Sequence, residues 1–312
     1  MEVKKIACGG NHTVMLLNDG SVYGCGDNSN GQLGQKVEFS GWRRLEQELR
    51  DVACGWEFTV GINGDNEVVT CGFGGRGELG VIGLKRAGSF VKVMKVCSGS
   101  KVFASVQNCV VVEPLGGGSR VYGWGSNTKC QLKQPKSRFL EVPVVIFESD
   151  SVMVEYAALG KDFTVLVDVL GRIVHTCGNL PSGFNIGQWE GQSGLQVHCM
   201  WSSVHILTPR NGIYSYGNGR HGQLFNRAEW CLDGVKQVAV GSEHGVILSN
   251  SNTVACWGWG EHGNCGRLTD DGTINNDYSN VISPLNRLPI PNGATITKVF
   301  AGCATTWLVA KN

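Results

Sequence analysis

The chain has 312 residues and a formal net charge of +1, and charged residues make up 17% of it. This near-neutral balance excludes a generally basic surface that would attract nucleic acid or anionic lipid. No apolar run approaches the roughly 20 residues that a membrane-spanning helix needs. The sequence runs from Met1 directly into regular pattern, without a secretory signal. These features predict a soluble protein of the cytoplasm, or of cytoplasm and nucleus, that contacts neither membrane nor nucleic acid directly.

One pattern recurs six times along the chain. Its clearest copy reads IACGGNHTVML at residues 6–16, NDGSVYGCG at 18–26 and NGQLG at 30–34. A glycine closes the middle part of every copy, at Gly26, Gly72, Gly125, Gly178, Gly217 and Gly258. Self-similarity over tens of residues indicates a repeat architecture. The copies span residues 3–34, 51–80, 93–132, 154–178, 194–225 and 235–266, and a half copy follows at 296–309.

Within each copy, the pattern predicts short antiparallel strands. The apolar segment 13–17 leads into Asn18-Asp19-Gly20, which is a hairpin signal, and a second strand follows at 21–25. No segment offers a convincing amphipathic helix. Small sheets repeated radially form a β-propeller, so we expect an all-β fold in a single domain over residues 1–312. Segments 35–50, 81–92, 133–153, 179–193 and 267–295 are interpreted as connections.

Thirteen cysteines suggest a metal site or disulfides at first sight. The number is odd and no Cys-x-x-Cys pair occurs, which weakens both interpretations. Cys8 and Cys25 recur one copy later as Cys54 and Cys71, at the same spacing and at strand positions. Free cysteine commonly serves as a small apolar core residue in a reducing compartment. We therefore expect packing cysteines, with no metal and no cofactor bound.

Two histidines occupy one position of the repeat, His12 and His244, three residues after a glycine. Phe58, Phe163 and Thr305 take the same position in other copies. A catalytic base or metal ligand could not be replaced in this way, so the position predicts turn packing. The glycine-rich stretch 72–77 lacks the following helix that a dinucleotide site needs. With no Ser-His-Asp order, paired carboxylates or P-loop, the sequence does not predict an enzyme.

The combination Gly-x-x-His, Asp-Gly, aromatic-x-aromatic-Gly-x-Asn and Gly-Gln-Leu-Gly resembles the propellers named after the regulator of chromosome condensation. The resemblance covers nearly the whole chain, and four spaced elements recur together. It implies a seven-bladed propeller. Such propellers usually begin with the second half of a repeat, which closes the ring, whereas Val3 already starts a full first half. We therefore expect an incomplete last blade, because an N-terminal segment that supplies the closing strands is missing.

A narrower resemblance lies in the residues that depart from the repeat. Four blocks carry it: residues 121–138, residues 160–163 with 171–175, residues 257–266, and residues 302–307. Together they resemble the fungal alpha-tubulin suppressor propellers, also called killer-toxin-insensitivity propellers. The resemblance implies a non-catalytic partner, in a heterodimer, of the small CSL-type metal protein of diphthamide synthesis. It also implies indirect links to the diphthamide enzymes and to Elongator-dependent modification of wobble uridine in tRNA.

Bulky or charged side chains stand in loops where the repeat itself places small polar residues. Tryptophan and arginine are enriched among the residues that dominate protein interfaces. For these loop residues, packing at a seam between blades is given the same weight as binding of a partner. For Trp124 and Trp257, which directly precede a repeat glycine, seam packing is the preferred interpretation. The candidate partner-binding residues are Trp56, Glu57, Lys161, Asp162, Trp201, Arg220, His221, Trp259, Glu261 and His262.

Two other functions are considered. The wider family suggests a guanine-nucleotide exchange factor for a Ran-type small GTPase, although the chain lacks a basic tail for nucleosomal DNA. An enzyme that uses the central channel of the propeller is the least favoured alternative, because no convergent acid–base pair is found.

Overall fold

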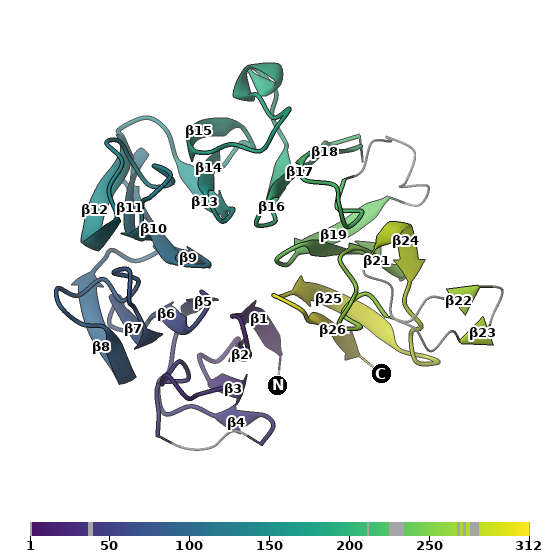
Figure 1. Ribbon diagram of the computed structural model, residues 1–312, viewed down its shortest axis with the longest axis horizontal. Coiled ribbons are helices and arrows are strands. Elements are labelled where there is room, and N and C mark those ends of the chain that lie inside the picture. The colour runs from purple at the N-terminus through teal and green to yellow at the C-terminus, as the bar shows by residue number, and fades with distance from the viewer. Residues whose placement is uncertain are drawn as a thin grey trace. The chain divides into compact units, whose positions relative to one another are not determined.

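The computed structural model describes residues 2–36, 40–210, 212–224, 234–266, 269–270, 273–274 and 281–311. The chain divides into two compact units, Met1–Leu180 and Pro181–Asn312. Regular structure in the described residues is antiparallel β-sheet apart from one short 3-10 helix, and the strands of each sheet follow the chain order (Figure 1). The all-β repeat expectation is therefore confirmed, and a single domain over residues 1–312 stays a prediction.

The first unit contains four sheets, which we call blades one to four. Blade one consists of β1 (Val3–Cys8), β2 (His12–Leu17), β3 (Val22–Gly26) and β4 (Arg43–Arg44). Blade two consists of β5 (Asp51–Cys54), β6 (Phe58–Ile62), β7 (Glu67–Phe73) and β8 (Arg86–Lys95). Blade three consists of β9 (Lys101–Ser105), β10 (Asn108–Leu115), β11 (Gly118–Ser126) and β12 (Phe139–Ser149). Blade four has β13 (Val154–Leu159), β14 (Phe163–Asp168) and β15 (Ile173–Gly178).

The second unit contains blades five and six and two smaller sheets. Blade five consists of β16 (Gln196–Cys199), β17 (Ser203–Leu207) and β18 (Ile213–Gly217), preceded by the 3-10 helix η1 (Ile186–Trp189). Blade six consists of β19 (Val235–Val240), β20 (His244–Ser249), β21 (Val254–Gly258) and β24 (Ile282–Arg287). The two-stranded sheets pair β22 (Thr269–Asp270) with β23 (Thr273–Ile274), and β25 (Thr295–Ala301) with β26 (Thr306–Lys311).

The described residues therefore form six blades of three or four strands, and the expected number of seven was wrong. The half copy at 296–309 pairs β25 with β26 only. A two-stranded sheet lacks the third and outer strands that make a blade. The number seven came from the family resemblance, whereas the six full copies of the pattern match the six blades.

Several segments interpreted as connections hold the outer strands of blades. β8 and β12 lie largely in the segments 81–92 and 133–153, and β12 pairs with β11 over most of its length. Their residues are mostly half-buried or exposed, because each of these strands lies at the edge of its sheet. Without a repeated glycine or a fully apolar run, such an edge strand is difficult to recognise in sequence.

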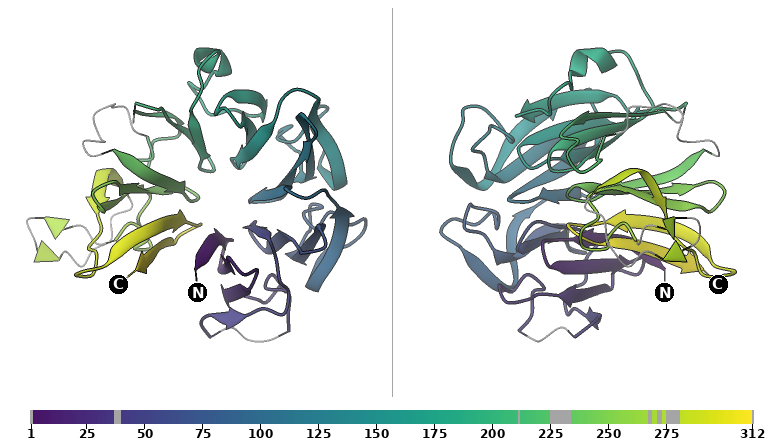
Figure 2. Two further views of the ribbon diagram at one scale, coloured as in Figure 1. Left: turned by 180° about the vertical axis from the view of Figure 1, so that it is seen from behind. Right: turned by 45° about the vertical axis from the view of Figure 1, so that its right-hand side comes forward.

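The hydrophobic core of the first unit lies between neighbouring blades. One cluster joins Val14, Leu16 and Leu33 of blade one to Val52 and Val69 of blade two. The first strands of neighbouring blades contact one another in series, from β1 to β5, β9 and β13, as labelled in Figure 1 and seen from other sides in Figure 2. Burying each such aliphatic side chain contributes about 1.5–3 kcal/mol. Every blade therefore depends on its neighbour for a core.

The repeat glycines are required by backbone conformation. All six have positive φ, between +91° at Gly178 and +116° at Gly217. At Gly26, a Cβ would lie 2.4 Å from the carbonyl oxygen of Asn11, so a side chain would collide with the neighbouring turn. Glycine adopts this region without strain. The periodic glycine thus marks the end of the third strand in each copy.

Candidate protein-binding rim

Two kinds of segment meet at one end of each blade. The turn between the first and second strands accepts a backbone hydrogen bond from the end of the third strand or the residue that follows it. Examples are the bonds from Phe73 N to Glu57 O (2.8 Å) and from Trp259 N to Glu243 O (2.8 Å). We call this end the turn rim. In the first unit it comprises residues 9–12, 27–34, 55–58, 73–80, 105–108, 126–138 and 160–163. In the second unit it comprises residues 200–203, 218–224, 241–244 and 259–266.

All ten candidate residues lie on the turn rim of their own unit. The first unit carries Trp56, Glu57, Lys161 and Asp162. The second unit carries Trp201, Arg220, His221, Trp259, Glu261 and His262. They share this placement because all ten follow either the first or the third strand of a copy. Their role in binding a partner stays a prediction.

In the second unit, three candidate residues surround Trp259. Its indole Nε1 donates a hydrogen bond to the Glu261 carboxylate (3.1 Å), and the His262 ring packs edge-on with centroids 4.8 Å apart. The ring of His221 lies 6.4 Å from the same indole and comes from the loop of blade five. Arg220, next to His221, is exposed. The structure thus assembles an aromatic residue, an acid and two imidazoles from two consecutive loops.

Trp56, Glu57 and Trp201 also take part in seams between blades. Trp56 donates its backbone N–H to Val106 and accepts from Gly10, so its turn connects blades one, two and three. Asn30 of blade one donates to the Glu57 carboxylate (2.9 Å). Trp201 donates its backbone N–H to Ser242 of blade six. The Trp56 residue is nevertheless 39% exposed, so the seam contacts leave it a surface for other molecules.

Lys161 and Asp162 occupy the turn between β13 and β14. Lys161 is exposed and Asp162 is half-buried. The carbonyl oxygen of Asp162 accepts a hydrogen bond from Asn179 N (2.8 Å), which closes the blade-four rim after β15. The geometry holds the turn in place and leaves the lysine directed to solvent.

The two repeat histidines are buried packing residues, as predicted. His12 Nε2 pairs with Thr59 Oγ1 of the next blade (3.0 Å), and His244 Nε2 pairs with Thr306 Oγ1 (3.0 Å). Burial lowers the pKa of each imidazole to about 4. Each ring therefore connects a turn to the neighbouring sheet in its neutral form. The indoles of Trp124 and Trp257 confirm the seam prediction, because they donate to the backbone carbonyls of Glu78 (2.8 Å) and Gln223 (2.9 Å).

A buried polar group in blade five was not recognised in the sequence. His205 lies between the hydroxyls of Ser203 (2.9 Å) and Ser215 (2.8 Å), and His198 is directly opposite on the paired strand. Burial lowers the pKa of His205 to about 3 and that of His198 to about 4. The available signal was the His and Ser residues on the strands of blade five. The sequence alone does not show which of these residues face one another, because that depends on the register between the strands.

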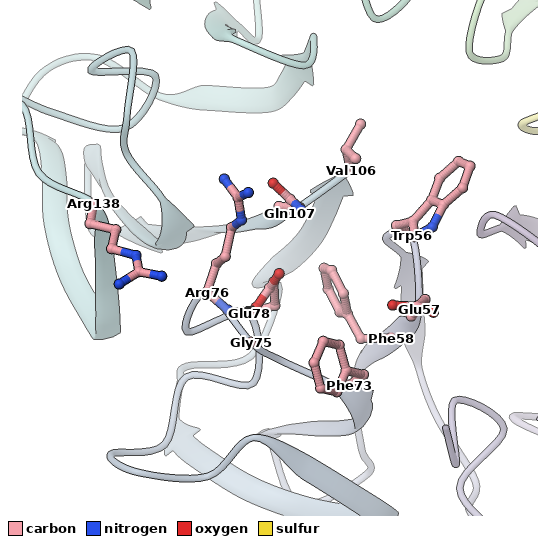
Figure 3. A pocket seen from close by; sticks show the side chains of 10 residues that line it. All are labelled: Trp56, Glu57, Phe58, Phe73, Gly75, Arg76, Glu78, Val106, Gln107 and Arg138. Carbon is pink, nitrogen blue, oxygen red and sulfur yellow. Dashed lines mark hydrogen bonds between the residues drawn. The ribbon is translucent and has the colours of Figure 1, made fainter. Parts of the chain in front are cut away.

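A hollow of about 160 Å³ opens on the turn rim between blades two and three. Figure 3 shows the side chains that line it, with Arg76 near Gln107, and Trp56 at the edge. Glu78 is only 5% exposed, its carboxylate accepts the backbone N–H of Arg76 (2.6 Å), and burial raises its pKa. Sequence reasoning missed Arg76, Glu78 and Arg138. Arg76 and Glu78 lie in one loop, and the loop of Arg138 is far from it in the chain.

The cysteines described by the structure are all free. Cys54, Cys71 and Cys256 are buried as predicted, and burial raises the pKa of the Cys54 thiol to about 12, whereas Cys97 is exposed. Among the described residues, no three His, Cys, Asp or Glu side chains are placed to hold a metal ion. In the same part of the chain, none of the helices has the length and apolar character to cross a membrane.

Comparison with known proteins identifies the repeat. The regulator of chromosome condensation (RCC1) repeat matches in one form at residues 3–32, 49–78 and 235–264, and in another form at residues 19–62 and 119–167. These matched segments thus correspond to RCC1 repeats, and the fold of the chain is that of an all-β propeller.

Individual relatives agree with this assignment. The chain is 26% identical to RCC1 repeat-containing protein C10F6.04 of Schizosaccharomyces pombe, over 98% of this chain and 89% of that protein. It is 23% identical to the secretion-regulating guanine nucleotide exchange factor of Mus musculus, over 99% of this chain and 65% of that protein. The solved structure of yeast RCC1 (Prp20) bound to Kap60 superposes with a TM-score of 0.73 at 17% identity, over 99% of this chain and 81% of that one.

Proposed function

We propose that this protein is a non-catalytic adaptor whose turn rim binds a small CSL-type metal protein in a heterodimer. Through that partner it supports diphthamide synthesis and Elongator-dependent modification of wobble uridine in tRNA, in the cytoplasm or in cytoplasm and nucleus. The observation that carries the proposal is the surroundings of Trp259. Its indole is oriented by Glu261 and flanked by His262 on the rim, and it belongs to one of the sequence blocks that resemble the killer-toxin-insensitivity propellers.

This geometry suits recognition of a protein. An interface residue that is already held in one rotamer loses less conformational entropy on binding. Aromatic residues surrounded by polar groups are common among the residues that dominate binding energy. The metal would belong to the partner, whose ligands need no contribution from this chain.

The test is calorimetric titration of the purified chain with the purified metal protein. We expect a 1:1 complex at micromolar concentration, and the absence of heat and of co-elution at tens of micromolar would reject the proposal. A pull-down from cells does not replace it, because indirect association through Elongator would give the same result.

A second candidate is guanine-nucleotide exchange on a Ran-type small GTPase. It is favoured by the similarity to the secretion-regulating guanine nucleotide exchange factor over 99% of this chain. The test is release of a fluorescent GDP analogue from the GTPase. Acceleration by catalytic amounts of the chain would support exchange activity and displace the adaptor proposal from first place.

A further inference from the structure

We propose that the hollow between blades two and three receives an acidic side chain from a segment of a partner protein. The carboxylate would lie between the guanidinium groups of Arg76 and Arg138. This inference rests on the proposed adaptor function, which it deepens by naming the chemistry of one contact.

The first observation is the charge of the loops that border the hollow. Residues 127–138, between β11 and β12, contain four basic residues and no acidic one: Lys129, Lys133, Lys136 and Arg138. Arg76 adds a fifth positive charge from the loop of blade two. None of the ion pairs found in the described part of the chain involves Arg76 or Arg138, and both side chains are exposed. In a chain of net charge +1, this is a local excess of positive charge.

The second observation is a neutral residue where the neighbouring turns carry acids. The residue directly before the second strand of a blade is Glu57 in blade two and Asp162 in blade four, but Gln107 in blade three. At the seam of blades one and two, Glu57 accepts a hydrogen bond from Asn30, the residue equivalent to Arg76. Arg76 therefore faces an amide where a carboxylate could have paired with it, and both residues line the hollow.

The two carboxylates inside the hollow do not supply the missing charge. Glu57 is engaged by Asn30 at the adjacent seam. Glu78 is fixed by the backbone N–H of Arg76, and its pKa is raised by burial, an effect stronger than the lowering by the Arg76 charge. The guanidinium groups thus remain available to an external acid, which Arg binds through two parallel N–H donors.

Size and charge favour one protein side chain over a nucleic acid or a membrane. A volume of about 160 Å³ suits a single side chain, and the exposed face of Trp56 can cover its methylene groups. A nucleic-acid backbone carries one charge at every nucleotide and needs a continuous basic track, whereas the hollow offers two guanidinium groups. A single carboxylate needs only the two guanidinium groups.

The test measures binding of a fluorescein-labelled hexaglutamate peptide to the full chain by fluorescence anisotropy at low salt. Hexaglutamine serves as the neutral control. We expect Arg76→Gln and Arg138→Gln each to weaken hexaglutamate binding about tenfold, as expected for one charged hydrogen bond. Gln107→Glu should weaken it to a similar extent, because it places a carboxylate beside Arg76 and leaves both arginines in place. Lys95→Gln, which removes the same charge at the opposite end of blade two, should change it less than twofold.

Each other outcome overturns the inference. One such outcome is that hexaglutamine binds as tightly as hexaglutamate, and another is that hexaglutamate binding is unchanged in the three hollow variants. A third is that a 12-nucleotide single strand or phosphatidylserine vesicles bind more tightly than hexaglutamate. Unfolding midpoints in urea confirm that the variants are folded. Since the peptide assay does not contain the CSL-type metal protein, a failed titration with that protein would reject the adaptor proposal alone, and a failed peptide assay would reject the hollow alone.

Discussion

The indole Nε1 of Trp124 in blade three donates a 2.8 Å hydrogen bond to the backbone carbonyl of Glu78 in blade two. Glu78 is the same residue whose carboxyl group forms part of the hollow on the rim. The seam that holds two blades together therefore also positions the residues of a candidate binding site. Stability and recognition are linked at this residue.

Replacement of Trp124 with phenylalanine should destabilise the protein by about 1–3 kcal/mol, because a buried carbonyl loses its donor and the seam loses volume. The free energy of unfolding in urea measures this. Trp56→Phe, at a residue that is 39% exposed, is the matched control and should change stability by less than about 1 kcal/mol. Equal losses of unfolding free energy in both variants would show that the hydrogen bond from Trp124 to Glu78 does not stabilise the protein.

Stability should fall when the pH drops below about 6.5. Burial lowers the pKa of His12, His198 and His244 to about 4 and that of His205 to about 3. The unfolded chain binds protons at these imidazoles below about pH 6.5 while the folded chain does not, so the unfolded state gains relative stability as the pH falls. Each such histidine adds a slope of up to about 1.4 kcal/mol per pH unit.

The measurement is the free energy of unfolding between pH 7.5 and pH 5. His205→Gln should flatten the slope below pH 6.5 by up to about 1.4 kcal/mol per pH unit. The exposed His262, changed to glutamine, should leave the slope as in the parent. A parent protein equally stable at pH 7.5 and pH 5 would contradict the buried neutral state.

A methyl group at a repeat glycine should be costly. Gly125 has a φ of +98°, and a Cβ there would lie 2.3 Å from the carbonyl oxygen of Gln107. We expect Gly125→Ala to lower the unfolding free energy by more than about 2 kcal/mol through strain and collision. At Gly116 nothing lies within 4 Å of a Cβ, so Gly116→Ala should be within about 0.5 kcal/mol of the parent. Thermal unfolding followed by circular dichroism compares the two, and similar midpoints would refute the argument.

Trp259 should dominate binding of the CSL-type metal protein. Trp259→Ala removes the indole that Glu261 and His262 hold in place, and about 2 kcal/mol of binding free energy, or roughly a thirtyfold higher Kd, is expected. Trp42→Ala changes a residue that is 38% exposed and lies outside the turn rim, and it should leave the Kd within about twofold. Calorimetric titration gives both values. If Trp42→Ala weakens binding more than Trp259→Ala, the partner uses another surface.

Local chemistry made much of the fold predictable from sequence. Gly26 and its counterparts must be glycine because their φ is positive, and the position of His12 tolerates Phe58 because both fill the same turn. These requirements involve only a few neighbouring residues, so each copy of the pattern contains the residue types that meet them. They predicted the inner strands of the blades, the all-β class, the two packing histidines of the repeat and the loops that carry all ten candidate residues.

The number of blades, the outer strands and the hollow were decided by tertiary structure. β12 is a strand because β11 offers it an edge to pair with, and its own residues carry only a weak pattern. Arg76 and Arg138 lie 62 positions apart in the numbering and border one hollow only because blades two and three pack together. Hydrophobic burial between blades brings such residues together, and this burial depends on pairs of distant segments that no single stretch of sequence specifies.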